Sequence, residues 1–239
     1  MVNTVYPTRG TDRFTKGCPL GVKERQERER EAVARSILDA ARELFVAEGY
    51  QNVSIRKIAD RIEYSPAAIY SYFPSKDDIF FALAEEGFHL LFSSADQDID
   101  PGPDGLDALR RPFWHLYQFS RTHPEYFALM FVDRSVPRIS QHWQRFSFVG
   151  VMKGHLSALI QRAVDAGHLP QGTEPHAVFR LLSAAMVGAA VMQLCNRLAP
   201  GEDGDALARD LLEAAVTGLR HGFTHTFHPA PCEVAPERS

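Results

Sequence analysis

Cysteine is scarce in this chain of 239 residues, which contains only Cys18, Cys195 and Cys232. The three form no CxxC pair and have no histidine at zinc-finger distance, so the sequence predicts neither a disulfide scaffold nor a zinc finger. His115, His142 and His155 lack an acidic or cysteine partner at i,i+4 spacing that would complete a set of metal ligands. We therefore expect no metal, no cofactor and a reducing, cytoplasmic location.

Long hydrophobic runs are also absent. The longest, at about residues 181–194, is interrupted by Ser183, Gly188 and Gln193, and it is shorter than the roughly 20 apolar residues that cross a bilayer. Residues 1–19 are polar and lack the apolar segment of a signal peptide. The sequence predicts a soluble protein without a membrane partner.

The common catalytic motifs are missing as well. The chain has no GxSxG, no Walker loop, no dinucleotide-binding glycines and no HExxH, and its carboxylates form no recognisable pair. We therefore expect that the protein is not an enzyme. No segment alternates polar and apolar residues for long enough to indicate a strand, so the predicted fold is all-α.

The charge of the chain is divided unevenly along its length. The net charge is −4. Residues 1–76 hold 13 Lys and Arg against 10 Asp and Glu, whereas residues 77–239 hold 13 against 20. The N-terminal part is therefore mildly basic and suits an acidic partner such as DNA, with affinity that depends more on placed contacts than on bulk charge.

Helical periodicity predicts an N-terminal three-helix head followed by a larger C-terminal helical bundle, with about nine helices in all. Ser54 and Ser65 stand where N-caps are expected, Pro66 stands at a first helical position, and Gly49 ends the first helix. The predicted helices cover about residues 23–48, 55–62, 66–73, 77–93, 105–122, 124–132, 138–167, 174–198 and 205–227.

These patterns predict four parts of the chain. Residues 1–22 form a disordered N-terminal extension, residues 23–76 a helix-turn-helix DNA-binding domain, residues 77–227 a helical effector-binding and dimerisation domain, and residues 228–239 a disordered tail. Residues 23–31 (KERQERERE) alternate in charge, which indicates a solvated helix start. A basic arm for a DNA minor groove is the alternative, and the interleaved glutamates argue against it.

Residues 54–76 have the pattern of two short helices joined by a tight turn, which is typical of a helix-turn-helix whose second helix enters the DNA major groove. The first turn of such a helix needs small side chains so that the backbone can approach the base edges. Ser65, Pro66, Ala67 and Ala68 provide them, and an alanine methyl group there can touch a thymine methyl group.

Hydroxyl and cationic side chains surround this turn. Ser54 stands at a helix N-terminus, which attracts phosphate, and Tyr70, Tyr72 and Lys76 have the reach for phosphate oxygens. Arg56 and Ser71 are candidates for either bases or backbone. For Tyr70, Tyr72 and Lys76, plain solvent exposure without a function is the alternative interpretation.

The sequence from Ile37 (ILDAARELFVAEGY and VSIRKIADRIEYSPAAIYSYFPSKDDIFFAL) resembles the DNA-binding domain of the TetR family of transcriptional regulators. The resemblance implies phosphate contacts from Ser54, Tyr70 and Lys76. It implies base or groove contacts from Arg56, Ser65, Pro66, Ala67, Ala68, Ser71 and Tyr72. The family commonly has glycine at the turn where Glu63 stands, and a left-handed backbone there costs a non-glycine residue roughly 1 kcal/mol.

The resemblance also implies a C-terminal domain that dimerises and binds an effector. The segment 174–198 combines Leu and Val with small residues that permit close helix packing, and segment 206–223 has a matching apolar stripe, so the two are candidates for a four-helix dimer interface. Aromatic and methionine side chains are candidates for the effector pocket, although simple core packing is the more common role. They are Trp114, Tyr117, Phe127, Met130, Trp143, Phe146, Met152, Phe179 and Met186.

The leading hypothesis is a ligand-responsive repressor that binds a palindromic double-stranded DNA operator as a homodimer and is released by a small, apolar effector. An α-helical enzyme or small-molecule carrier with an incidental helix-turn-helix is one alternative. An activator or DNA-organising protein with the same head is another.

Overall fold

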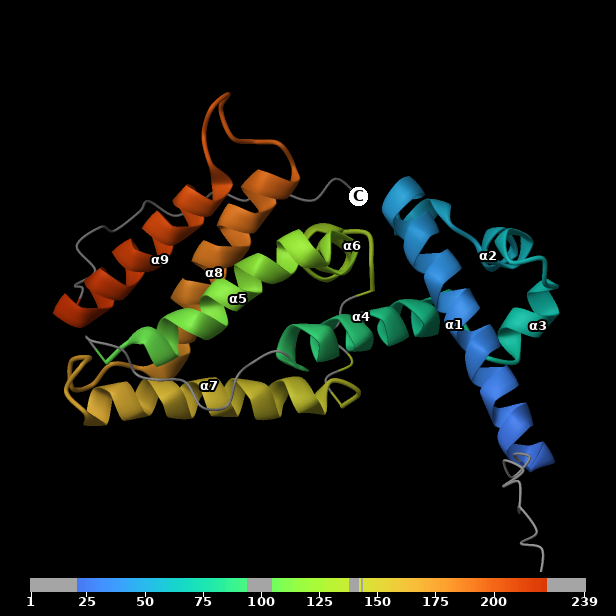
Figure 1. Ribbon diagram of the computed structural model, residues 1–239, viewed down its shortest axis with the longest axis horizontal. Helices are drawn as coiled ribbons and strands as arrows, with labels where there is room; N and C mark the ends of the chain where they lie inside the picture. Colours follow the sequence, from blue (N-terminus) through green and yellow to red (C-terminus); the bar gives the residue numbers. More distant parts are fainter. Residues whose placement is uncertain (1–20, 94–104, 138–141, 143, 223–239) are drawn as a thin grey trace, which may run out of the picture.

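The computed structural model describes residues 21–93, 105–137, 142 and 144–222. Within these ranges the chain forms nine α-helices, two short helical turns of other types and no strand (Figure 1). The predictions of an all-α fold and of about nine helices are confirmed. The predicted disordered tail, residues 228–239, and nearly all of the predicted extension, residues 1–22, lie outside the described residues.

The head is built from α1 (Val22–Glu48), a 3-10 turn (η1, Tyr50–Asn52), α2 (Ile55–Arg61) and α3 (Pro66–Tyr70). Its core consists of side chains at helical spacing on one face of each helix, because only such faces can be buried together. Ile37, Ile58 and Ile69 are each fully buried, one from each helix.

The ends of these short helices follow from their capping residues. The Ser54 Oγ accepts a 3.2 Å hydrogen bond from the Lys57 N–H, and the Ser65 Oγ accepts one of the same length from the Ala68 N–H. These bonds satisfy N–H groups that have no partner within the helix. Gly49 follows α1 with φ of 79°, a conformation in which glycine avoids steric strain.

The turn between α2 and α3 contains the one departure from the family pattern noted in the sequence. Glu63 has φ of 59°, in the left-handed region. The turn therefore keeps the shape that glycine usually allows, and the Glu63 Cβ makes it costlier.

Helix α4 (Lys76–Ser93) leaves the head and enters the bundle, as Figure 1 shows. There it meets α5 (Asp107–Thr122), α6 (Pro124–Phe127) and a π-helical turn (η2, Ala128–Val132). The bundle is completed by α7 (Ser147–Asp165), α8 (Pro175–Leu194) and α9 (Gly204–His221), of which α8 and α9 lie side by side, away from the head.

Two predicted helices of the bundle differ from the structure. The helix predicted at 124–132 changes from α to π geometry after Phe127. The helix predicted at 138–167 begins only at Ser147, because residues 144–146 form a turn in which the Arg145 N–H bonds the His142 carbonyl at 3.0 Å. Residues 138–141 and 143 lie outside the described part.

Helix α8 carries more apolar surface than the protein itself covers. Among the described residues it is the one helix that is long and apolar enough to cross a membrane, by length and composition. The sequence predicted that the apolar run at about residues 181–194 is too short for this, which does not hold for the whole helix of 20 residues. Only 28% of that apolar stretch is buried inside the protein. Small residues along α8 let it pack closely against α9.

Candidate nucleic-acid interface

The ten predicted DNA-binding residues lie at the N-cap and first turn of α2, along α3 and just after it, and at the start of α4. Three of them, Ala68, Tyr72 and Lys76, are half-buried. The others are exposed: Ser54, Arg56, Ser65, Pro66, Ala67, Tyr70 and Ser71. Their roles toward DNA remain predictions.

Arg56 and Tyr70 are the most accessible large side chains among these residues. The Arg56 side chain is 83% exposed, and its only ion pair within the described residues is a loose one of 3.9 Å with Asp60, one turn along α2. Tyr70 is 54% exposed. Their charged and hydroxyl ends are therefore free to meet a ligand at little desolvation cost.

The serine hydroxyls among these residues differ in what they can offer. The capping oxygens of Ser54 and Ser65 accept hydrogen bonds, so each hydroxyl hydrogen can still be donated to a phosphate oxygen. The Ser71 hydroxyl instead donates a 2.7 Å bond to the Ala68 carbonyl. In this arrangement Ser71 presents only lone pairs, which suit a base amino group better than a phosphate.

Lys76 is held inside the head more firmly than its predicted phosphate role suggests. Its ammonium group donates to the carbonyl oxygens of Tyr50 at 2.8 Å and Val53 at 3.0 Å, and it lies 4.0 Å from the centre of the Tyr50 ring. Burial lowers the pKa of this ammonium. Lys76 thus anchors the start of α4 to η1, and one remaining N–H is the most it can offer to a phosphate.

The N-terminal part of α1 lies next to the end of α3. The Arg30 Nη2 approaches the Ser71 carbonyl oxygen at 3.5 Å, and the guanidinium group lies 5.6 Å from the centre of the Tyr72 ring. Arg30 was not among the residues predicted from the sequence. Its helical phase, seven residues before the buried Ile37, would have placed it on this side.

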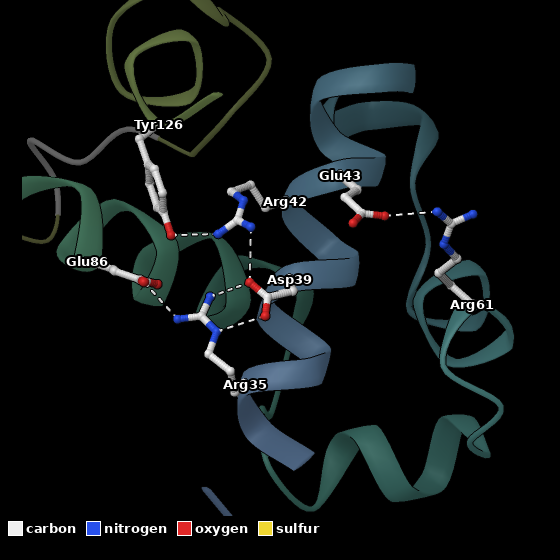
Figure 2. Close-up of polar contacts among 7 residues, drawn as sticks. All are labelled: Arg35, Asp39, Arg42, Glu43, Arg61, Glu86 and Tyr126. Atoms are coloured by element: carbon white, nitrogen blue, oxygen red, sulfur yellow. Dashed lines mark hydrogen bonds and ion pairs between the residues drawn. The ribbon is translucent and has the colours of Figure 1, made fainter. Parts of the chain in front are cut away.

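The head is joined to the bundle by a polar network between α1, α4 and α6 (Figure 2). The Arg42 Nη1 donates a 2.8 Å hydrogen bond to the Tyr126 hydroxyl, and its guanidinium group lies 5.2 Å from the centre of that ring. Asp39 stands between two arginines on α1, 2.9 Å from Arg35 and 3.1 Å from Arg42. Arg35 reaches Glu86 on α4 at 2.7 Å.

Burial and hydrogen bonds shift the pKa values of groups in this network. Burial lowers the pKa of Arg35, but its hydrogen bonds to Glu86 and Asp39 outweigh that effect and raise the pKa above its ordinary value. Burial raises the pKa of the Tyr126 hydroxyl. The second oxygen of Glu86 is buried without a hydrogen-bond partner among the described residues. The contacts between head and bundle are therefore largely charged, and one buried oxygen among them has no hydrogen bond within the described residues.

The residues predicted to line an effector pocket fall into separate groups. Phe146 meets Phe88 of α4 edge to face at 5.8 Å between ring centres, and the ring centre of Phe127 lies 4.9 Å from that of Phe131. Trp114 and Tyr117 lie 5.2 Å apart on α5. Phe127, Phe146, Tyr117 and Met186 are buried, whereas Trp114, Met130, Met152 and Phe179 are half-buried, and Trp143 lies outside the described residues. Their ligand-binding role remains a prediction.

A polar depression of about 400 Å³ lies where the head meets the bundle. None of the predicted effector residues that the structure describes lines it. Its walls are Tyr50, Gln51, Lys76, Asp77, Ser135, Val136, Pro137 and His142. The Gln51 side chain donates a 2.8 Å bond to the Ser135 carbonyl there, which adds a second junction between the two parts.

Comparison with known proteins places the head in a family. Residues 37–83 match the family model of bacterial regulatory proteins of the tetR family. A Mycobacterium tuberculosis protein described as an HTH-type transcriptional repressor is 38% identical over 64 residues, 27% of this chain and 34% of that protein. The chain thus spans about a third of this relative, as it does of an uncharacterised HTH-type regulator of Bacillus subtilis, of which 35% is matched.

Other likenesses extend over most of the chain. The fatty acid metabolism regulator protein of Bacillus subtilis is 22% identical over 195 residues, covering 77% of this chain and 94% of that protein. A crystal structure of the regulator FadR from Bacillus subtilis in complex with stearoyl-CoA has the same fold, with a TM-score of 0.62 at 16% identity over 77% of this chain and 98% of that one. Residues 37–83 thus carry a DNA-binding domain similar to that of the tetR family of bacterial regulatory proteins, within a fold that most of the chain shares with solved regulators.

Proposed function

We propose that the protein is a transcriptional repressor that binds a palindromic DNA operator as a homodimer and is released from it by a small apolar effector. The observation that carries this proposal is the surface of α2 and α3, where Arg56 and Tyr70 are exposed beside the thin turn Ser65–Ala67. The segment lies within the stretch that matches the family model. The description of the Mycobacterium tuberculosis relative as a repressor supports the direction of regulation.

The outer face of α8 and α9 supports the homodimer. Leu181 and Met192 of α8 are 39% and 40% exposed, and Leu211 of α9 is 36% exposed. Gly188 lies between the two α8 side chains at helical spacing, and no atom lies within 4 Å of where its Cβ would stand. Two copies of this apolar, small-residue face can pack into a four-helix interface around a twofold axis.

Such a dimer presents two α3 helices to DNA. A twofold arrangement suits a palindromic operator whose half-sites are about one helical turn apart, roughly 34 Å. The spacing of the heads then decides affinity, since both helices must enter major grooves on one side of the duplex.

The bundle supports an effector of apolar character. Aromatic rings from α4, α5 and the N-cap of α7 pack in its interior, and the contact of Arg42 with Tyr126 is among those that join it to the head. The likeness to a regulator solved with stearoyl-CoA supports the same class of ligand. A ligand that shifts α6 relative to α4 changes the position of α1 and therefore of α3.

DNA binding is tested by fluorescence anisotropy with the DNA upstream of the protein's own gene. Arg56→Ala removes a head arginine, and we expect it to weaken binding by about 5- to 150-fold, the effect of roughly 1–3 kcal/mol. Arg209→Ala is the matched control, because that arginine is also exposed with one loose ion pair, of 3.8 Å, but lies on α9. Absence of sequence-specific binding by the wild type would contradict the proposal.

The remaining parts of the proposal have their own measurements. Deletion of the gene raises transcription of the regulated genes if the protein is a repressor and lowers it if the protein is an activator. A thermal-shift screen of lipophilic compounds identifies the effector class. A compound that stabilises the protein without weakening its hold on DNA would contradict release by that compound.

A further inference from the structure

The first turns of α1 extend beyond the core of the head and pass the end of α3 (Figure 1). The contacts of Arg30 with the Ser71 carbonyl and the Tyr72 ring fix this part of the helix beside the DNA-binding surface. All residues from Lys23 to Ala32 are exposed. The segment therefore forms surface next to α3 without contributing to the core.

The alternating charges of this segment separate onto different faces once it is helical. The face that carries the core residues Ile37 and Val33 continues toward the N-terminus as Arg30, Gln26 and Lys23, which follow one another at spacings of three and four residues. Two cations and one amide thus lie on the side where α1 meets α3.

The glutamates of the segment do not cancel this charge. Glu24 accepts a 3.1 Å hydrogen bond from the Gly21 N–H and caps its own helix, and Glu29 pairs with Arg25 at 3.1 Å. Glu31 projects from a different face, and Glu27 stands at the edge. The interleaved glutamates, which argue against a DNA contact when read along the sequence, therefore lie mainly away from the helix face that carries Lys23, Gln26 and Arg30. We call this face the strip.

We propose that Lys23, Gln26 and Arg30 form a second contact with DNA, binding the phosphate backbone beside the groove that α3 enters. The inference rests on the proposed DNA-binding function. Residues 23 and 30 are separated by about 10 Å along the helix at 1.5 Å per residue. That length matches about three phosphates of one strand, which follow at 3.4 Å along the duplex. The positive end of the α1 dipole adds to the attraction.

The test compares Lys23→Ala with Arg28→Ala in salt titrations of DNA binding. Both variants remove one positive charge from an exposed position, but Arg28 projects from the opposite face of α1. We expect Lys23→Ala to weaken binding to operator and to random DNA alike. We also expect it to reduce the slope of log K against log salt by about 1, because one phosphate contact is lost. Arg28→Ala should leave the slope unchanged.

A second variant and a second measurement distinguish the loss of a phosphate contact from unfolding of the head. Arg30→Gln should reduce the slope similarly, with thermal melts checking that the head stays folded without the Tyr72 contact. Phosphate ethylation should interfere with the wild type at outer phosphates and lose that effect in Lys23→Ala. Equal slopes for all three variants would overturn the second contact through the strip, while sequence-specific binding by the wild type would uphold the proposed DNA-binding function. No wild-type binding would overturn both.

Discussion

The Arg42 guanidinium donates a 2.8 Å hydrogen bond to the Tyr126 hydroxyl and joins residues 84 positions apart in the sequence. Tyr126→Phe removes the hydroxyl and keeps the ring under the guanidinium. We expect a loss of about 1 kcal/mol in the free energy of unfolding, since Arg42 retains Asp39 as a partner. Urea unfolding measures this, with the exposed Tyr64→Phe as a control that should change nothing.

Three tyrosines should make the protein sensitive to alkali. Burial raises the pKa of Tyr50, Tyr117 and Tyr126 above the ordinary value of 10.0. The unfolded chain therefore releases these protons first, so their contribution to stability is complete below about pH 10 and is lost as the pH rises through the raised values. Lys76, with a lowered pKa, opposes this trend.

The measurement is urea unfolding between pH 9 and pH 11. We expect the free energy of unfolding to fall over this range, and to fall less in Tyr126→Phe. Absorbance at 295 nm should show tyrosines that ionise only on unfolding. A stability that rises with pH would show that the Lys76 contribution dominates.

Glu63→Gly should stabilise the head. The left-handed φ of 59° at this turn costs a residue with a Cβ about 1 kcal/mol, and glycine removes that cost. The gain should appear in the free energy of unfolding without a change in the denaturant slope. Glu63→Ala keeps the Cβ and should show no gain, which separates the backbone effect from loss of the carboxylate.

Gly188→Arg should separate the two copies of the dimer. Space around the missing Cβ is open within one protomer, so the arginine fits there, and replacing a helical glycine favours the helix. Across a twofold interface the same side chain adds bulk and charge. Light scattering should give the monomer mass, whereas Gly154→Arg on α7, also with open space, should leave the oligomeric state unchanged. A monomeric wild type would contradict the predicted interface.

The head could be predicted closely because its boundaries are set by local chemistry. Ser54 and Ser65 cap the helices expected from them, since an N-cap bond depends only on residues within the same turn. The cost at Glu63 was also anticipated, because the turn has few possible shapes. The end of α3 was placed too late, at about residue 73. The chain leaves the helix after Tyr70, where the Ser71 hydroxyl bonds the Ala68 carbonyl.

Long-range contacts could not be predicted in the same way. Nothing in the local sequence indicates that Lys76 is held by the carbonyls of Tyr50 and Val53, because these partners are 26 and 23 residues away. The charges of residues 23–31 separate onto different faces only once the segment is helical, so their order in the sequence does not show which of them lie next to α3. The effector residues are the least predictable, because core and pocket use the same aromatic side chains.

The apolar side chains exposed on α8, Leu181 and Met192, have a consequence for how the amount of DNA-binding protein depends on expression of the gene. In the proposed dimer, two copies must associate before both heads can bind one operator. As long as free protomers outnumber dimers, the concentration of dimer then rises with the square of the protomer concentration. Halving synthesis then removes about three quarters of the functional molecules. If the proposed dimer forms, a twofold change in expression of this chain would change the amount of DNA-binding dimer by up to about fourfold, even without any effector.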